Sequence, residues 1–243
     1  MAWAYYQEKL SAERLRRVYE IASPRVRQYL QAEIDFVLSR MGAGDRVLEL
    51  GCGYGRVLDQ LSKKSQWVFG IDTSQTSLAL CRKLHQGHPP FQVAAMDAFH
   101  LGFRTGSFDL VVCIQNGISA FKGNPPALMQ EALRVTRQGG SALFSSYAEA
   151  FWSERLEWFR VQAHEGLLGE IDEERTGNGV IICKDGFKAS TYGPKDFIDL
   201  AHSLGLEPGI FEVDGSSLFC ELYRQATGGT TKHEKEFTPN SEF

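Results

Sequence analysis

The sequence lacks the features that mark secreted, membrane-spanning or nucleic-acid-binding proteins. No apolar run approaches the ~20 residues that a membrane-spanning helix needs. The first residues show no basic segment followed by an apolar core, so we expect no secretory signal. The formal net charge of -4 provides no excess of basic side chains for phosphate groups. We therefore expect a cytoplasmic protein with neither a membrane nor a nucleic acid as partner.

Cysteines are few, and their spacing fits neither disulfides nor a metal site. The five cysteines lie far apart, at Cys52, Cys81, Cys113, Cys183 and Cys220. Disulfide frameworks and structural zinc sites both rely on closely spaced cysteines such as C-x-x-C pairs. The pattern is typical of buried, reduced thiols, and it predicts no bound metal.

What the chain does contain is a large hydrophobic fraction and a regular alternation of strand and helix patterns. Hydrophobic residues make up 43% of the 243 residues, enough for a sizeable core. From residue 46 onward, strand patterns alternate with helix patterns, as in a parallel sheet. The strands are expected at residues 46–50, 67–71, 91–95, 108–114, 141–146, 210–213 and 217–223.

Two segments do not follow this alternation. Residues 1–42 carry helix patterns, with Ser23 as a cap before a proline. In residues 147–191 an aromatic-rich helical stretch precedes two expected short strands, at 171–175 and 180–184, around a turn signal. We expect an N-terminal helical segment at 1–42, an α/β domain at 43–225 with an inserted cap at about 147–191, and a flexible tail at 226–243.

The most informative stretch is a glycine turn between the first strand and the next helix. Gly51, Gly53 and Gly55 occupy every second position there. Glycines at such a turn allow φ > 0 and let a ligand approach with no Cβ in the way. A dinucleotide-binding fold uses G-x-G-x-x-G, but Arg56 occupies the position of its third glycine. A plain glycine turn without a ligand is the alternative.

Farther on, the pair Gly139 and Gly140 is expected to end the helix that begins at residues 124–125.

Two aspartates end the following strands. Asp72 ends the second strand, where a carboxylate can accept hydrogen bonds from both hydroxyls of a ribose; a helix cap is the alternative. Asp97 ends the third strand, where a carboxylate can accept from the exocyclic amine of adenine; a surface turn is the alternative.

The G-x-G-x-G turn with Glu49 before it and the two aspartates after it resembles the motifs of class I S-adenosylmethionine-dependent methyltransferases. Residues 101–112, 128–140 and 192–206 also resemble this family, so the resemblance covers about 45–223. It implies an α/β, Rossmann-like, seven-stranded and mostly parallel sheet with helices on both faces. The expected strand order is 3-2-1-4-5-7-6, with strand seven antiparallel. It also implies S-adenosyl-L-methionine as cofactor and S-adenosyl-L-homocysteine as product.

The resemblance assigns roles in cofactor binding to individual residues. These residues are Glu49, Gly51, Cys52, Gly53, Asp72, Thr73, Ser74, Asp97, Ala98 and Gln115. Glu49 and the glycine turn would face the methionine part, Asp72 the ribose and Asp97 the adenine. Gln115 would turn its carbonyl toward the methionine amine. Arg56 would either pair with the cofactor carboxylate or only start a helix.

No catalytic residue can be named from the sequence. A sulfonium methyl is already electrophilic, so its transfer depends mostly on proximity and alignment. An acceptor that must lose a proton also needs a base. The candidates for that base are Tyr5, Tyr6, His100, Tyr147 and His164, each of which is more often structural than catalytic.

The sequence indicates less about the methyl acceptor than about the cofactor. Residues 114–119 lack the Asn-Pro-Pro-Tyr and Pro-Cys motifs of nucleobase-modifying members and the acidic cluster of metal-dependent members. Acidic residues in the insertion would favour a cationic acceptor, with a solvated face as the alternative. We expect an enclosed pocket for a small molecule between the N-terminal segment and the insertion. Its acceptor side is expected to contain Tyr5, Tyr6, Asn116, Tyr147 and Trp152.

The sequence thus predicts methyl transfer from S-adenosylmethionine to a small-molecule amine, thiol or hydroxyl, by a monomer or homodimer. One alternative is a non-catalytic module or partner subunit that binds S-adenosylmethionine. Another is a nicotinamide-dependent reductase, against which Arg56 and the closing strand hairpin argue.

Overall fold

The structure is a computed structural model, and it describes residues 5–85 and 91–225. The tail expected at 226–243 lies outside the described residues. Within the described ranges, no helix is long and apolar enough to cross a membrane.

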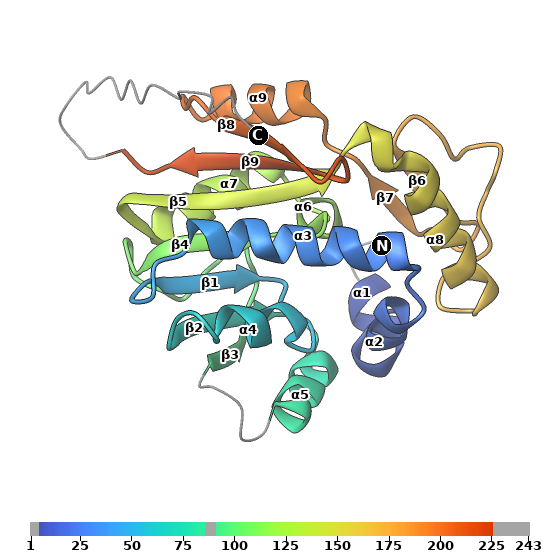
Figure 1. The fold of residues 1–243 in the computed structure, drawn as a ribbon, viewed down its shortest axis with the longest axis horizontal. Coiled ribbons are helices and arrows are strands. Elements are labelled where there is room, and N and C mark those ends of the chain that lie inside the picture. The colour runs from blue at the N-terminus through green and yellow to red at the C-terminus, as the bar shows by residue number, and fades with distance from the viewer. Residues whose placement is uncertain (1–4, 86–90, 226–243) are drawn as a thin grey trace, which may run out of the picture.

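A seven-stranded sheet forms the centre of the molecule (Figure 1). Its strands are β1 (Arg46–Leu50), β2 (Trp67–Asp72), β3 (Phe91–Ala95), β4 (Phe108–Cys113), β5 (Thr136–Tyr147), β8 (Gly209–Val213) and β9 (Ser217–Tyr223). The order is β3-β2-β1-β4-β5-β9-β8, and β9 is antiparallel to both of its neighbours. The predicted order and the antiparallel strand are therefore confirmed. The strand order reverses between β1 and β4, the place where open α/β sheets bind ligands.

Helices cover both faces of the sheet because successive strand residues point to opposite sides. Val47 packs in the core beneath α3 (Pro24–Arg40), α4 (Arg56–Leu61) and α5 (Gln75–Leu84). Its neighbour Leu48 packs in the core beneath α7 (Pro125–Val135) and α9 (Pro194–Ser203). The predicted start of α3 is confirmed, since the Ser23 hydroxyl accepts a hydrogen bond from Val26 N at 3.2 Å.

The N-terminal helices and the insertion share a second core beyond the end of the sheet. The N-terminal part is α1 (Tyr5–Glu8) and α2 (Ala12–Glu20). The insertion contains η2 (Glu149–Phe151), α8 (Trp152–His164) and the hairpin β6 (Val180–Ile182) and β7 (Lys188–Ser190). Figure 1 shows these pieces gathered at one end of the sheet. Their apolar side chains form one buried cluster, so two segments far apart in sequence fold against each other.

The prediction that Gly139 and Gly140 end a helix is wrong. The helix ends at Val135, and β5 begins at Thr136 and runs through both glycines. Gly139 has φ +75°, and the pairing with β4 shifts register nearby, as at a β-bulge. A Cβ at Gly140 would overlap the carbonyl oxygen of Asp109, so the glycine permits close strand approach.

The expected strand pairing inside the insertion is also wrong in part. The turn at Asn178 and Gly179 forms, with reciprocal hydrogen bonds of 2.9 Å between Gly177 and Val180. However, β6 pairs with β7 rather than with residues 171–175, which contribute one isolated bridge at Ile171. A second turn, closed by a hydrogen bond of 2.9 Å from Cys183 N to the carbonyl oxygen of Phe187 and containing Gly186 at φ +95°, brings β7 back onto β6.

Candidate active site

The glycine turn joins β1 to α4 directly above the end of β2. Gly51 has φ +79°, and both Gly51 N and Cys52 N donate to the carbonyl oxygen of Ile71, at 2.8 and 2.9 Å. A Cβ on Gly51 would lie 3.2 Å from the ring of Phe121, which lines the cavity described below. The turn is therefore locked to β2, and its backbone is open toward the cavity.

Asp72, at the end of β2, is held in one orientation by backbone donors. Its carboxylate accepts hydrogen bonds from Gly53 N at 2.9 Å and from Ser74 N at 2.7 Å. Burial raises the pKa of this carboxyl, and the backbone N–H groups oppose that rise. Each carboxylate oxygen keeps acceptor capacity, so the group can still accept from two ligand hydroxyls.

Asp97 follows the neighbouring strand and lies at the same end of the sheet. It lines the same cavity as Asp72 and accepts hydrogen bonds from Phe99 N at 3.0 Å and from the His100 ring at 3.2 Å. With 53% of its side chain exposed, it forms the outer rim of the site.

Glu49 is a buried carboxylate with unused acceptor capacity. It is 5% exposed, and its Oε2 has no hydrogen-bond partner. Burial raises its pKa to about 8, partly offset by the positive charge of Arg56 and reinforced by Asp72. Because an unpaired buried carboxylate is costly, the site has a place for a ligand group that is cationic or donates a hydrogen bond.

The turn after β4 contains two successive left-handed residues. Gln115 and Asn116 have φ +57° and +58°, a conformation that is rare for non-glycine residues and is often found at functional sites. Gln115 N donates to Glu33 Oε2 at 2.6 Å and to Ser145 Oγ at 2.8 Å, which holds the turn in place. The Gln115 side chain lines the cavity, and its Nε2 is buried without a partner.

Asn116 connects this turn to the insertion. Its Nδ2 donates to the carbonyl oxygen of Ser190 on β7 at 3.1 Å, and its Oδ1 accepts from Ser146 Oγ at 2.8 Å. The Asn116 side chain thus bonds to β7 and β5 in this structure.

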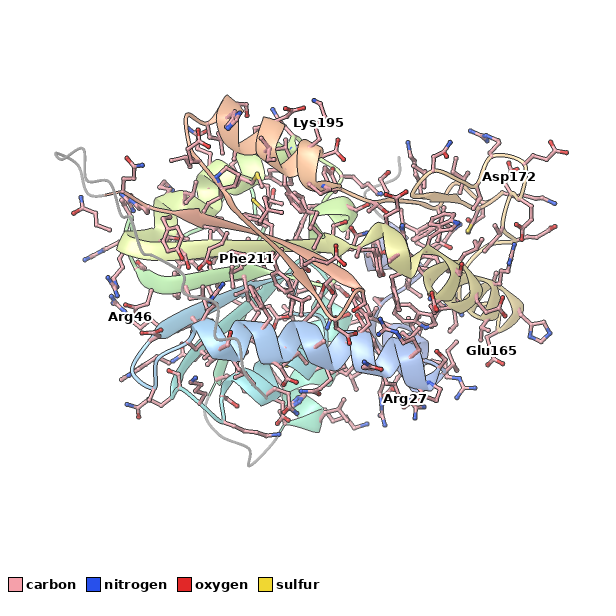
Figure 2. The ribbon with its side chains drawn as sticks, turned by 45° about the horizontal axis from the view of Figure 1, so that its top comes forward. Arg27, Arg46, Glu165, Asp172, Lys195 and Phe211 are labelled. Atoms are coloured by element: carbon pink, nitrogen blue, oxygen red, sulfur yellow. The ribbon has the colours of Figure 1, made fainter. Side chains whose placement is uncertain are left out.

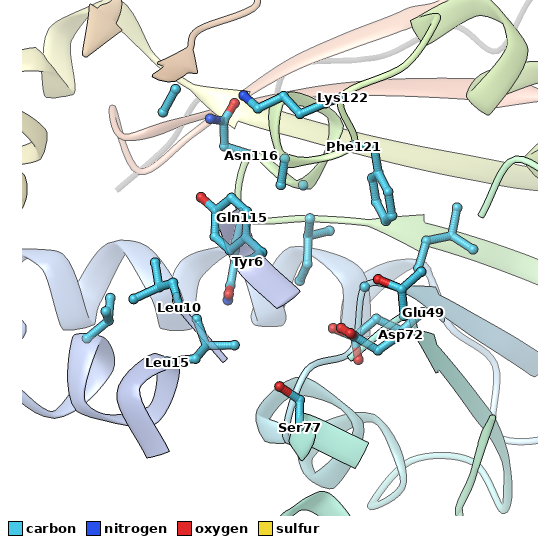
Figure 3. A pocket seen from close by; sticks show the side chains of 18 of the residues that line it. Tyr6, Leu10, Leu15, Glu49, Asp72, Ser77, Gln115, Asn116, Phe121 and Lys122 are labelled. Carbon is cyan, nitrogen blue, oxygen red and sulfur yellow. The ribbon is translucent and has the colours of Figure 1, made fainter. Parts of the chain in front are cut away.

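These groups surround one cavity of about 680 Å³ (Figure 3). Glu49 and Asp72 lie together at one side of it, with Phe121 above them, while Tyr6 and Gln115 lie nearer its middle. The size falls within the range of about 300–1,000 Å³ that is usual for small-ligand sites.

Some of the site residues predicted from the sequence line the cavity, and others lie outside its wall. The wall includes Glu49, Gly51, Asp72, Thr73, Asp97, Gln115, Tyr6, Asn116 and Tyr147. Among the described residues, Cys52, Gly53, Ser74, Ala98, Tyr5 and Trp152 lie outside that wall. Gly53 and Ser74 hold Asp72, and Tyr5 instead donates to Asp185 Oδ2 at 2.9 Å, behind the wall.

The cavity wall offers poor general bases among the candidates. Tyr6 and Tyr147 line it, but burial raises the pKa of both hydroxyls, that of Tyr147 to about 12. His100 and His164 are exposed and do not belong to the wall in the described part of the chain.

Several residues near the cavity were not singled out from the sequence. Glu33 is fully buried on α3, and burial raises its pKa to about 7. Its spacing from Val26, Leu30 and Val37 places it on the buried face of the helix, a signal that could have revealed it. Arg155, also fully buried, lies in an aromatic-rich stretch of the insertion.

Arg56 lies against the N-terminal helices. Its guanidinium is 4.5 Å from the ring centroid of Tyr19, and its Nη2 is buried without a partner. It contributes opposite charge to Glu49 and Glu33, so its electrostatic role here is to balance these carboxyls.

The chain matches known methyltransferases in sequence. Residues 47–140 match a family model described as a methyltransferase domain. The chain is 31% identical over 106 residues to a ubiquinone biosynthesis O-methyltransferase from Paracidovorax citrulli, covering 42% of this chain and 44% of that protein. The chain spans about half the length of the curated relatives that it matches.

Solved structures share the fold at low sequence identity. The CcbJ methyltransferase from Streptomyces caelestis matches with a TM-score of 0.63 at 16% identity, covering 93% of this chain and 100% of that one. The N-methyltransferase NodS from Bradyrhizobium japonicum, solved with S-adenosyl-L-homocysteine, matches with a TM-score of 0.59 at 14% identity, covering 91% and 97%.

The family match over residues 47–140 and the shared fold support a class I S-adenosylmethionine-dependent methyltransferase. The resemblance seen in the sequence is thereby confirmed.

Proposed function

We propose that this protein transfers the methyl group of S-adenosylmethionine to a small-molecule acceptor. The observation that carries the proposal is one continuous cavity. It joins the carboxylates at the ends of β1–β3 to an aromatic chamber, the part of the cavity between the N-terminal helices and the insertion. When bound, S-adenosylmethionine supplies an electrophilic methyl group, and alignment with an acceptor lone pair accounts for most of the chemistry.

The residues of the β1–β3 ends suit this cofactor by their chemistry. Asp72 would accept from the ribose hydroxyls, and Asp97 from the adenine amine. The unpaired Glu49 carboxylate would take the cationic methionine end, and the Gln115 backbone turn would position that end beside the chamber. Support comes from the unpartnered Oε2 of Glu49, from the acceptor capacity that Asp72 keeps beside its two backbone donors, and from their common cavity.

The chamber favours a small acceptor over a macromolecule. α1 and α2 cover it from one side, and α8 and β7 cover it from the other, with Tyr6 and Trp158 among the wall residues. Covering by both segments would exclude water from the donor methyl. A reducing compartment suits the five cysteines, which are all free and buried, and we place the protein in the cytoplasm.

The test is transfer of a labelled methyl group. The protein is incubated with methyl-labelled S-adenosylmethionine and a mixture of small metabolites, and in parallel with bulk RNA and protein. We expect label in low-mass products and none in the macromolecules. Labelled RNA or protein would refute the small-molecule acceptor, and S-adenosylmethionine binding without any product would favour a non-catalytic binding module.

A further inference from the structure

The cavity is divided by charge. Glu49, Asp72 and Asp97 are the carboxylates of its wall, and all three lie at the β1–β3 ends. The chamber between the N-terminal helices and the insertion has a wall of aromatic and aliphatic side chains such as Tyr29 and Phe187. In the described part of the chain this chamber wall contains no carboxylate.

A buried cation lies directly behind the chamber wall. The Arg155 guanidinium is fully buried, 4.3 Å from the ring centroid of Tyr147 and 5.6 Å from that of Phe159. Its hydrogen bonds go to neutral oxygens, the carbonyls of Gly179 and Ala189 at 3.0 and 3.1 Å and the hydroxyl of Thr191 at 2.5 Å. Among the described residues it forms no ion pair, and its Nε is buried without a partner. A buried charge without an ion-pair partner is costly, so an anion placed in the chamber would stabilise Arg155; the buried Glu33 carboxyl forms no ion pair with it among the described residues.

The acidic surface of the insertion does not supply that anion. Its glutamates, including Glu157, Glu165 and Glu173, are exposed, and each of these three pairs with an arginine. Figure 2 shows Glu165 and Asp172 on the outside of the insertion. The notion that these residues attract a cationic acceptor into the pocket therefore has no geometric basis in the described residues, none of which brings an insertion carboxylate to the cavity wall.

The aromatic faces of the wall are also poorly suited to an ammonium group. Arg155 already lies over Tyr147 and Phe159. A second cation on these rings would meet repulsion from the first. Lys122, whose Nζ donates to the carbonyl oxygen of Lys188 at 2.5 Å, adds another positive charge at the wall.

Two carboxamides provide hydrogen-bond donors for an anionic oxygen. Gln162 is 2% exposed on α8, lines the chamber and has an Nε2 with no partner. Gln115 presents a second buried and unpartnered Nε2 to the same cavity. Unsatisfied buried donors of this kind point to a ligand acceptor atom.

We propose that the chamber takes a small aromatic oxyacid, a flat ring system bearing an ionised carboxyl or hydroxyl oxygen, and discriminates against amines. This inference rests on the proposed function, whose acceptor class it narrows. An ionised acceptor oxygen forms the new O–C bond with the donor methyl while the S–C bond breaks and its electron pair stays on sulfur. The acceptor proton has left before this step, so the chamber needs no basic tyrosine.

The experiment compares two probes of one skeleton, cinnamate as the anion and cinnamylamine as the cation. Calorimetry measures the binding of each to the full chain, with and without saturating S-adenosylhomocysteine. We expect cinnamate to bind at least about tenfold more tightly. Equal affinities, tighter amine binding, or no cinnamate binding up to about 10 mM would overturn the proposal.

Variants test which residues cause the preference for cinnamate over cinnamylamine. Arg155→Met should reduce the preference to within about threefold, whereas Arg155→Lys retains the charge and should retain the preference. Gln162→Leu, which leaves Arg155 in place, should weaken cinnamate at least about threefold and leave cinnamylamine unchanged; it is the decisive variant if Arg155→Met does not fold. Unchanged cinnamate affinity in Gln162→Leu would contradict the assigned donor role.

Titration of S-adenosylhomocysteine into the same protein distinguishes a wrong acceptor class from a wrong proposed function. Binding of S-adenosylhomocysteine together with equal probe affinities would refute only the acceptor class. Cinnamate preference without S-adenosylhomocysteine binding would refute the proposed function and leave the charge of the chamber as found.

Discussion

Glu33 gives a prediction whose size follows from its surroundings. Burial raises its pKa from the usual 4.5 to about 7, so the folded protein holds this proton more tightly than the unfolded chain. Stability is therefore greatest below the unfolded pKa and is lost as the pH rises through the folded pKa. Between pH 5 and pH 8 the loss is on the order of 2 to 3 kcal/mol.

Glu33→Gln removes the titrating charge and keeps an oxygen that can accept from Gln115 N. The free energy of unfolding from urea denaturation, measured at both pH values, should show the variant close to wild type at pH 5. At pH 8 the variant should be more stable by roughly 2 kcal/mol. Glu49 and Asp72, whose pKa values are also raised by burial, contribute equally to both proteins and cancel in the comparison.

Glu154→Gln, an exposed change on α8, is the matched control and should leave the difference between the two pH values as in wild type. A Glu33→Gln variant that is less stable than wild type at pH 8 would refute the reasoning. So would a variant with the same pH dependence as wild type, because Glu33 would then titrate equally in the folded and unfolded chains.

Three further predictions address the cofactor site, the covering segment and the sheet. Because burial raises the Glu49 pKa to about 8, a cationic ligand should displace the proton of this carboxyl. Calorimetry near pH 7 in buffers of different ionisation enthalpy should detect the proton release on binding, and Glu49→Gln should abolish it. Deleting residues 1–10, which include Tyr6 and Leu10 of the cavity wall, should lower the rate of methyl transfer far more than it lowers the melting temperature, and a full rate would contradict the covering role. Gly140→Ala should cost about 2 kcal/mol or more in denaturation experiments, because its Cβ overlaps the Asp109 carbonyl oxygen; an unchanged midpoint would show that β4 and β5 adjust.

The sheet, and the meeting of the glycine turn with Asp72 and Asp97 at one cavity, could be predicted because their signals are local. The glycine turn and the two strand-end aspartates lie next to the strands that position them, and parallel strands bring those ends together. The same locality misled the interpretation of Gly139, since a glycine pair indicates a helix end or a bulge equally well. The choice depends on β4, whose Asp109 carbonyl lies against Gly140.

The chamber between the N-terminal helices and the insertion was harder to predict because it depends on contacts between distant segments. Trp158 Nε1 donates to the Val18 carbonyl oxygen at 3.1 Å across 140 residues, and Glu33 reaches Gln115 across 82. The hydrophobic periodicity of one segment does not reveal its contacts with a distant segment. Arg155 shows the same difficulty, because an arginine beside glutamates in sequence suggests a surface position until the fold buries it.

The central claim is that the cavity above β1 and β2 binds S-adenosylmethionine through Asp72. The most direct measurement is calorimetric titration of S-adenosylhomocysteine into wild type and Asp72→Ala, with circular dichroism to confirm that both are folded. The account predicts a micromolar dissociation constant for wild type and at least about a tenfold loss in the variant. No binding to wild type, or equal affinity in a folded Asp72→Ala, would contradict it.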